Sequence, residues 1–160
     1  MAAMTETPSR TAPPVTNLQI VLDAADPHAQ AKFWAAALGW TVQRSPEFVQ
    51  QMLDQGIATP EDVVEIDGQL AWRTAEALRH PDHDRIRELG GAARMLFQTV
   101  PEAKTVKNRM HLDVNVGRDS IDATVARLKA LGATVLWKVD EPGAFHTTMA
   151  DPEGNEFCVQ

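Results

Sequence analysis

Few side chains of this 160-residue chain combine reactive chemistry with a defined position, and His111 is the foremost of them. His111 and Asp113 alternate with the apolar Met110 and Leu112, an order typical of a strand with one polar and one buried face. An imidazole there can bind a metal ion or act as a general base. It can equally be a polar residue that hydrogen-bonds to Asp113, to Gln19 or to water, and the sequence leaves both interpretations open.

Two more reactive side chains, Glu156 and Cys158, lie close to the end of the sequence. Cys158 is the only cysteine, which excludes an intramolecular disulfide and leads us to expect a cytoplasmic protein in a reducing compartment. Nothing beside Cys158 in the sequence marks a reactive thiolate. A small buried hydrophobe is therefore favoured over a nucleophile or a metal ligand.

Other histidines and the tryptophans are weaker candidates. The segment 80–84 holds two histidines and two aspartates, but its proline and polar residues are typical of an exposed turn. His146 lies in an alternating strand, where it faces either a pocket or solvent. Large aromatic side chains are more often core residues or subunit contacts than pocket walls, and of the four tryptophans we retain Trp72 as a pocket candidate.

The elements that must position these residues occur twice along the chain. Residues 18–24 alternate as a half-buried strand, Asp26 favours the start of a helix, and Gly39 favours its end. The same order returns in the second half, with Asp119 as the predicted helix cap and Gly132 as the predicted stop. This agreement in element order, caps and stops indicates an internal duplication.

In the alignment of the two copies Gln19 is equivalent to His111, and each copy is predicted to form a βαβββ unit. The first copy is much longer than the second, so it contains an insertion. The predicted division of the chain is a disordered leader at 1-14, a first module at 15-100 with the insertion at about 45-80, a linker at 101-108 and a second module at 109-160.

The insertion has predicted elements of its own. Its pattern predicts a short amphipathic helix at 46–55 and a short strand at 62–66. The segment 70–78 fits either the third strand of the unit or a helix. A long insertion beside a binding site can act as a lid or a specificity element, which is why Trp72 remains a candidate.

Composition and charge argue against several classes of function. The chain has 15 Lys and Arg against 22 Asp and Glu, a formal net charge of -7 that opposes binding to a phosphate backbone. The one basic cluster, Lys104, Lys107 and Arg109, is typical of a solvated linker. No apolar run approaches the ~20 residues of a membrane helix, and the leader lacks the features of a signal peptide. We therefore expect a soluble protein that binds neither nucleic acid nor a membrane.

A resemblance to a known superfamily is carried by LQIVLDAADPHAQAKFWAAALGWTVQ at 18–43, HLDVNV at 111–116, LGA at 131–133 and ADPEGNEFCV at 150–159. With these segments the chain resembles the vicinal oxygen chelate superfamily, which contains glyoxalase I, extradiol dioxygenases, fosfomycin-modifying enzymes and bleomycin-binding resistance proteins. More narrowly it resembles bacterial glyoxalase-like domain proteins. The resemblance implies an α+β fold in which two paired βαβββ modules form curled mixed sheets around a central cup, and it implies a homodimer.

The resemblance also implies positions for metal ligands, on the first and last strands of each module. His111 falls on the ligand position of the second module and Gln19 on that of the first. The last-strand position, usually a glutamate, is Cys158, and its first-module counterpart is Leu96 or Gln98. Glu156 precedes Cys158 by two residues on the same strand face and can substitute for it, so the candidate metal ligands are Gln19, His111, Glu156 and Cys158. One divalent ion, Zn, Ni, Mn, Fe or Mg, would suit such a site, and a cup without metal is equally compatible with these residues.

Strand parity combined with this fold turns the polar faces of the two opening strands toward the cup, so that Gln19 and His111 should meet across a shared hollow. The predicted ligand-pocket residues are Gln19, Val21, Trp72, Gln98, His111, Asp113 and His146. We expect a small-molecule-binding protein. It is either a divalent-metal-dependent lyase or isomerase acting on a small oxygenated substrate, or a metal-free drug or metabolite binding (sequestration) protein whose acidic surface attracts a cationic ligand. A structural or regulatory partner domain ranks below both.

Overall fold

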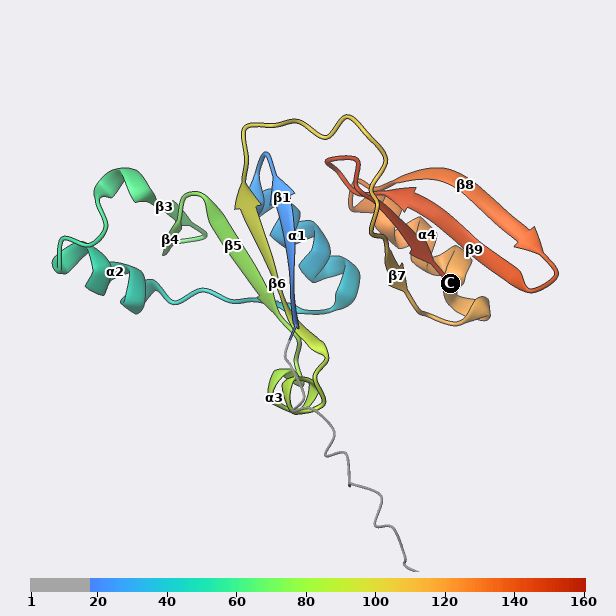
Figure 1. The fold of residues 1–160 in the computed structure, drawn as a ribbon, viewed down its shortest axis with the longest axis horizontal. Helices are drawn as coiled ribbons and strands as arrows, with labels where there is room; N and C mark the ends of the chain where they lie inside the picture. The colour runs from blue at the N-terminus through green and yellow to red at the C-terminus, as the bar shows by residue number, and fades with distance from the viewer. Residues whose placement is uncertain (1–17) are drawn as a thin grey trace, which may run out of the picture.

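The computed structural model describes residues 18–160, and the leader predicted at 1-14 lies outside these residues. The chain forms two four-stranded sheets and one two-stranded sheet (Figure 1). Each four-stranded sheet belongs to one βαβββ unit and is mixed, with one parallel and two antiparallel strand pairs. The predicted α+β architecture is confirmed.

The first module has the strand order β1-β6-β5-β2. Its helix α1 begins where it is predicted to begin, because the side chain of Asp26 accepts hydrogen bonds from the backbone N–H of His28 and Ala29. The helix ends at Gly39, whose φ of 68° is left-handed and suits glycine. The elements are β1 (Leu18–Ala24), α1 (Pro27–Leu38), β2 (Thr41–Val42), β5 (Ala75–Arg79) and β6 (Ala92–Thr99).

The second module repeats this order as β7-β10-β9-β8. The elements are β7 (Leu112–Val114), α4 (Ile121–Ala130), β8 (Thr134–Glu141), β9 (Ala144–Ala150) and β10 (Glu156–Val159). The prediction that Asp119 caps the helix is wrong: Asp119 lies inside a short 3₁₀ turn, η2 (Arg118–Ser120), and α4 starts after it without a side-chain cap. The opening strand is also shorter than its apolar alternation suggests, and His111 directly precedes it.

The insertion stands beside the first sheet (Figure 1). Its elements are α2 (Pro46–Asp54), η1 (Pro60–Asp62), β3 (Val63–Ile66) and β4 (Gln69–Trp72). The predicted helix and strand are therefore present. The undecided segment 70–78 divides between β4 of the insertion and β5 of the module sheet, because residues 73 and 74 form a turn.

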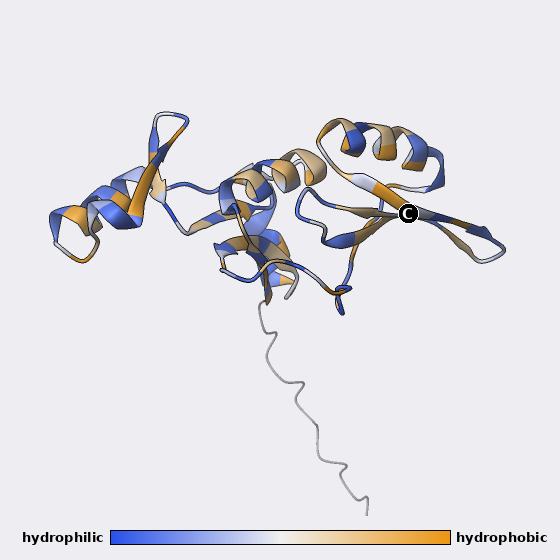
Figure 2. Cartoon of the chain, turned by 90° about the horizontal axis from the view of Figure 1, so that it is seen from above, coloured by the Kyte–Doolittle hydropathy of each residue, from blue (hydrophilic) through white to orange (hydrophobic). Residues whose placement is uncertain are grey.

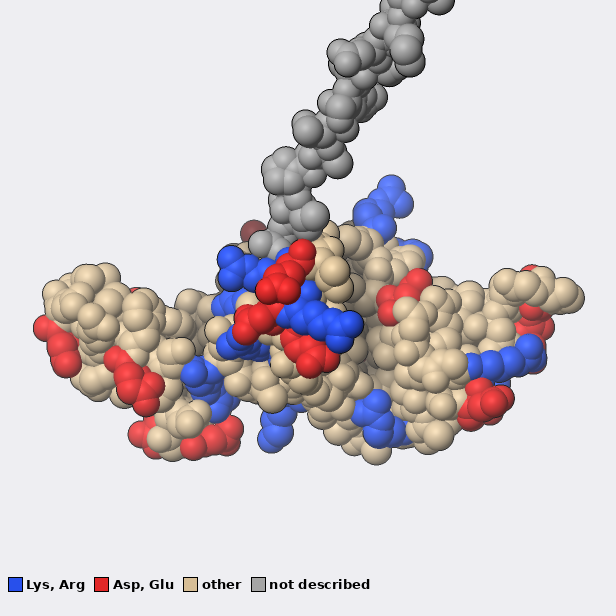
Figure 3. Space-filling view, turned by 90° about the horizontal axis from the view of Figure 1, so that it is seen from below, with Lys and Arg blue, Asp and Glu red and all other residues tan. Residues whose placement is uncertain are grey.

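One further helix, α3 (His83–Glu88), lies between β5 and β6. The prediction of an exposed turn over 80–84 is thus only half correct, since the turn leads directly into this helix. No helix in the described part of the chain is long and apolar enough to cross a membrane. The face of the molecule in Figure 3 carries acidic and basic side chains next to one another. This face therefore lacks the uniformly positive potential that attracts a nucleic acid.

The helices α1 and α4 lie on the same side of the two sheets (Figure 2). The alternating residues Ile20 and Leu22 of β1 pack against the core on this side, as do Leu112 and Val114 of β7. The intervening side chains of both strands therefore project from the opposite sheet face. This arrangement follows from the period-2 alternation of the two opening strands.

Helix α1 joins the two modules through its aromatic side chains. Phe33 and Trp34 pack edge to face on Phe157 of β10, with ring centroids 6.3 and 5.1 Å apart. The buried indole N–H of Trp34 donates a hydrogen bond to the carboxylate of Asp151 over 3.1 Å. From the other side Arg127 of α4 donates to two carbonyl oxygens in the last turn of α1. These contacts set the spacing between the two sheets.

Candidate functional site

A cavity of about 810 Å³ lies between the two modules. Its walls come from β1, from the linker after β6, from the start of β7 and from the turn before β10. This volume falls within the range of about 300–1,000 Å³ in which small-molecule sites occur. Its apolar lining includes Val21, Leu22, Trp34, Val106, Met110 and Leu112.

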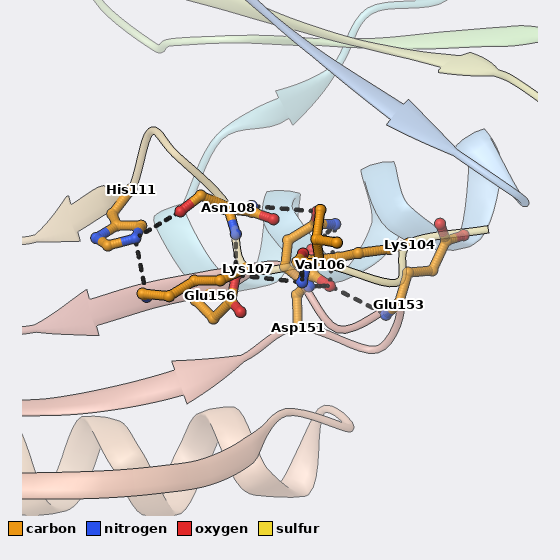
Figure 4. A network of polar contacts seen from close by, with 9 residues as sticks. Lys104, Val106, Lys107, Asn108, His111, Asp151, Glu153 and Glu156 are labelled. Carbon is orange, nitrogen blue, oxygen red and sulfur yellow. Dashed lines mark hydrogen bonds and ion pairs between the residues drawn. The ribbon is translucent and has the colours of Figure 1, made fainter. Parts of the chain in front are cut away.

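The linker over this cavity is held by the carboxylate of Glu156. Figure 4 shows Lys104 and Asn108 directed toward it from the linker. The ammonium group of Lys104 lies 3.2 Å from Oε2 of Glu156, and the backbone N–H of Asn108 donates to the same oxygen over 2.9 Å. Burial alone would raise the pKa of Glu156, but these hydrogen bonds hold the pKa below its ordinary value. The carboxylate is therefore already committed to anchoring the linker.

His111 is tied to the same linker. Its Nε2 atom lies 3.1 Å from Nζ of Lys107 and 3.0 Å from the carbonyl oxygen of Asn108 (Figure 4). A neutral imidazole nitrogen can either accept from the lysine or donate to the carbonyl, but it cannot do both. The Lys107 ammonium also lies 5.4 Å from the ring centroid of Trp137, which is a cation–π contact.

On the first opening strand the polar side chains bond to the neighbouring strand β6. Gln19 accepts a hydrogen bond from the guanidinium of Arg94, and Asp23 accepts one from the amide of Gln98 over 3.0 Å. Arg94 also donates through Nε to the side-chain oxygen of Gln43 over 2.9 Å. The side-chain oxygen of Gln19 is thus hydrogen-bonded to a cation and is not free to coordinate a metal ion.

A second, smaller cavity of about 210 Å³ lies between the first sheet and the insertion. Arg94 and Leu96 of β6 line its floor, and Phe48 and Trp72 of the insertion line its wall. The two aromatic rings meet edge to face with their centroids 6.4 Å apart.

The predicted pocket residues are distributed over both modules. Val21 lines the larger cavity, as does the proposed ligand Glu156, and Trp72 lines the smaller one. Asp113 accepts a hydrogen bond from Gln160 over 3.3 Å, and His146 is half-buried opposite Val139 of β8. The remaining predicted pocket residues line neither cavity: Gln19, Gln98, His111, Asp113 and His146.

The side chains expected to bind a metal do not form a metal site. Within residues 18–160 no group of three or more His, Cys, Asp and Glu side chains is arranged to hold an ion. Gln19, His111 and Glu156 each have a cationic side chain as a partner, and a divalent cation at these atoms would face repulsion from it. Cys158 is half-buried, with Sγ 3.6 Å from the hydroxyl of Thr148. Residues of this kind do not fit a resident divalent ion.

Three basic residues contact the expected ligands without having been predicted to do so: Lys104, Lys107 and Arg94. Lys104 and Lys107 belong to the linker cluster that was interpreted as solvated, and their spacing gives no sign that Lys104 has a carboxylate partner 52 residues away. Arg94 lies in β6, but nothing in that strand indicates that Gln19 of β1 and Gln43, directly after β2, would meet it.

The chain was compared with known families and structures. The family model described as "Glyoxalase-like domain" matches residues 19–160. No curated protein matches the chain in sequence.

Solved structures resemble the chain in fold. A hypothetical protein from S. aureus is 14% identical, with 89% of this chain and 91% of that chain covered and a TM-score of 0.56. A glyoxalase/bleomycin resistance protein/dioxygenase family enzyme from Burkholderia phytofirmans is 16% identical, with 88% and 94% covered and a TM-score of 0.55. The fosfomycin resistance protein FosX from Listeria monocytogenes, in complex with Mn(II) and a dihydroxypropylphosphonic acid, is 10% identical, with 89% and 86% covered and a TM-score of 0.54.

The family match spans nearly the whole described chain, and the duplicated βαβββ architecture agrees with it. The chain therefore belongs to the glyoxalase-like domain family of the vicinal oxygen chelate superfamily.

Proposed function

We propose that this protein binds a small organic molecule in the cavity between its two modules, without a resident metal ion. The observation that carries the metal-free part of the proposal is the pairing of three of the four implied ligands with a cation: Gln19 with Arg94, His111 with Lys107, and Glu156 with Lys104. The cavity itself is lined by hydrogen-bond donors such as Lys104 and Lys107 and by apolar side chains, which suit an organic ligand, in place of free lone pairs, which suit an ion.

The lining of the cavity supports a molecule with an apolar body and polar groups. Trp34, Leu22 and Leu112 provide apolar surface beneath the linker, and Lys107 and Asp23 stand among the polar groups. The sequence-based expectation of a cationic ligand rests on net charge alone. Because the cavity carries side chains of both signs, its lining does not favour a cation over a neutral oxygenated molecule.

A screen of metabolites by thermal shift in the presence of a chelator tests this proposal. A ligand at 100 times its Kd stabilises the native state by about 2.7 kcal/mol, which for a chain of this size corresponds to a Tm increase of about 5–10 °C. The shift should decrease in Val21→Phe, which places a larger side chain at the wall of the cavity, and persist unchanged in Val135→Phe. Both valines are 43% exposed, and only Val21 lines a described cavity, so the second variant is a matched control.

A metal-dependent lyase or isomerase is the second candidate function. It is favoured by the fold similarity to FosX, whose structure contains Mn(II). Elemental analysis of the purified protein and of His111→Ala separates the two candidates. Stoichiometric metal that is lost in His111→Ala would contradict the metal-free proposal, whereas metal at background level in both proteins supports it.

We also propose that the protein is a cytoplasmic homodimer. Leu18 of the edge strand β1 and Leu136 of the edge strand β8 expose large apolar side chains, and a second copy would cover such surface. Light scattering should give twice the chain mass of 17.6 kDa, and a mass of one chain would reject the dimer. Cell fractionation should place the protein with cytoplasmic markers.

A further inference from the structure

The smaller cavity beneath the insertion has features of a binding site that is separate from the cavity between the modules. Its floor is the face of the first sheet opposite α1, and its wall is formed by α2 and β4. The two cavities share no lining residue. A ligand in the smaller cavity would therefore be recognised by the insertion and not by the linker.

Arg94 is the unusual group in this cavity, because its guanidinium has neutral partners. Nε donates to the amide oxygen of Gln43 over 2.9 Å, and a terminal nitrogen donates to the amide oxygen of Gln19. Within residues 18–160 no carboxylate lies within ion-pair distance of Arg94. Burial lowers the pKa of Arg94, and no acidic side chain offsets this effect.

The neighbouring Arg44, which lines the same cavity, is the opposite case. Its guanidinium lies 2.7 Å from Glu76 and 3.3 Å from Asp67. Burial by itself lowers the pKa of Arg44, but the two carboxylates raise it above its ordinary value. Arg44 and Glu76 thus neutralise each other, and Glu76 also lies 3.1 Å from the ring of His28. The uncompensated charge of the cavity is that of Arg94.

The two glutamines hold the guanidinium in place while leaving donors free. A guanidinium has five N–H groups in a planar fork, and the two amide oxygens engage one nitrogen each. The remaining N–H groups on the terminal nitrogens suit the two oxygens of a carboxylate. Because the side chain is already oriented, little conformational entropy would be lost when an anion binds.

Apart from Gln43, Arg44, Ser45, Glu76 and Arg94, the side chains that line the cavity are apolar, and the cavity is of limited size. Phe48 and Trp72 form an aromatic wall opposite Leu96 and Ala77. A cavity of ~150 Å³ lined by apolar side chains accommodates benzene. A volume of about 210 Å³ therefore accommodates one ring with a small charged substituent.

We propose that the cavity beneath the insertion binds a small carboxylate that carries an aromatic or similarly compact apolar group, with Arg94 as the anchor for the carboxylate and Trp72 as a wall for the ring. In this arrangement Gln19, at the position where the superfamily resemblance implies a metal ligand, orients the arginine. The proposal does not depend on the ligand of the cavity between the modules.

Benzoate and its neutral isostere benzamide are the probes that test the proposal. Isothermal titration and NMR titration of the full chain, at low salt, should give a Kd of about 1 mM or tighter for benzoate, with benzamide at least ten times weaker. The indole N–H signal of Trp72 should shift with benzoate. Equal affinity for the two probes, or no shift of the Trp72 indole signal at 50 mM benzoate, would overturn the proposal. Both measurements use the wild-type protein.

Substitutions test whether Arg94 binds the carboxylate of the ligand. Arg94→Gln removes the charge and should weaken benzoate binding at least tenfold while leaving the affinity for benzamide unchanged. Because an uncompensated, partly buried cation is lost, the Tm of Arg94→Gln without ligand should equal or exceed that of the wild type. Val21→Phe, which changes the wall of the other cavity, should bind benzoate like the wild type. Retention of benzoate binding in Arg94→Gln, or its loss in Val21→Phe, would contradict the assignment.

Discussion

The substitution Trp34→Phe tests whether α1 sets the distance between the two modules. Trp34 is 1% exposed, donates a hydrogen bond to the carboxylate of Asp151 and lines the cavity between the modules. Loss of a hydrogen bond to a charged group costs about 1.5–3 kcal/mol. The smaller ring leaves a void of about 40 Å³, which adds about 1 kcal/mol. The sum predicts a loss of about 3 kcal/mol in the free energy of unfolding.

Urea unfolding followed by circular dichroism measures this loss, and the Tm should fall by about 6–12 °C. Trp137→Phe is the matched control, because Trp137 is 46% exposed and has no side-chain hydrogen bond within the described residues. It should change the stability by less than about 0.5 kcal/mol. The reasoning is refuted if Trp34→Phe costs less than about 1 kcal/mol or no more than Trp137→Phe.

A double-mutant cycle separates the hydrogen bond from the packing. Asp151→Asn keeps the shape of the acceptor but removes its charge, although Asp151 also accepts from the backbone N–H groups of Glu153 and Asn155. If the indole bond contributes as calculated, Trp34→Phe and Asp151→Asn should show a coupling energy of about 1–2 kcal/mol. Strict additivity of the two substitutions would assign the whole loss to packing.

Three further predictions concern the linker and α1. Arg127→Met removes the donors to the carbonyls of Ala36 and Ala37 and should cost about 1–2 kcal/mol in urea unfolding, whereas Arg118→Met, at an exposed arginine, should be nearly neutral. Glu156→Gln removes the charge that holds the linker. Trypsin should therefore cleave this variant after Lys104 or Lys107 at least five times faster than it cleaves the wild type. An unchanged cleavage rate would show that Glu156 does not anchor the linker. Because the pKa of Glu156 is lowered, its anchoring is present above the unfolded-state pKa and is lost as the pH falls through the lower folded-state pKa. In NMR pH titration the amide of Asn108 should therefore shift with a midpoint below 4.5, and a midpoint above that value would contradict the assigned hydrogen bonds.

Patterns among residues close in the sequence were sufficient to predict the fold. The cap formed by Asp26 and the left-handed Gly39 each depend on residues within a few positions in the sequence, so their chemistry is visible without the tertiary structure. The cap predicted at Asp119 failed for a local reason as well, since one 3₁₀ turn moved the helix start. The period-2 alternation likewise identified the core sides of β1 and β7.

The candidate site depended on contacts that no local signal contains. Position 19 could be recognised as equivalent to position 111 by duplication, but the partners of the two side chains could not. Gln19 meets Arg94 because β1 lies parallel to β6, and Glu156 at the start of β10 meets Lys104 of the linker, 52 residues away, whereas the contact of His111 with Lys107, four residues away, is local.

The sequence by itself therefore determined the two βαβββ units, the cap and the stop of α1, and the family, because periodicity and capping act between neighbours along the chain. Only the tertiary structure decided that cations meet the expected metal ligands and that Trp72 and Arg94 share a cavity. The contact of Gln19 with Arg94 joins strands 75 positions apart in the sequence, where the sign and reach of each side chain, and not its spacing, select the partner.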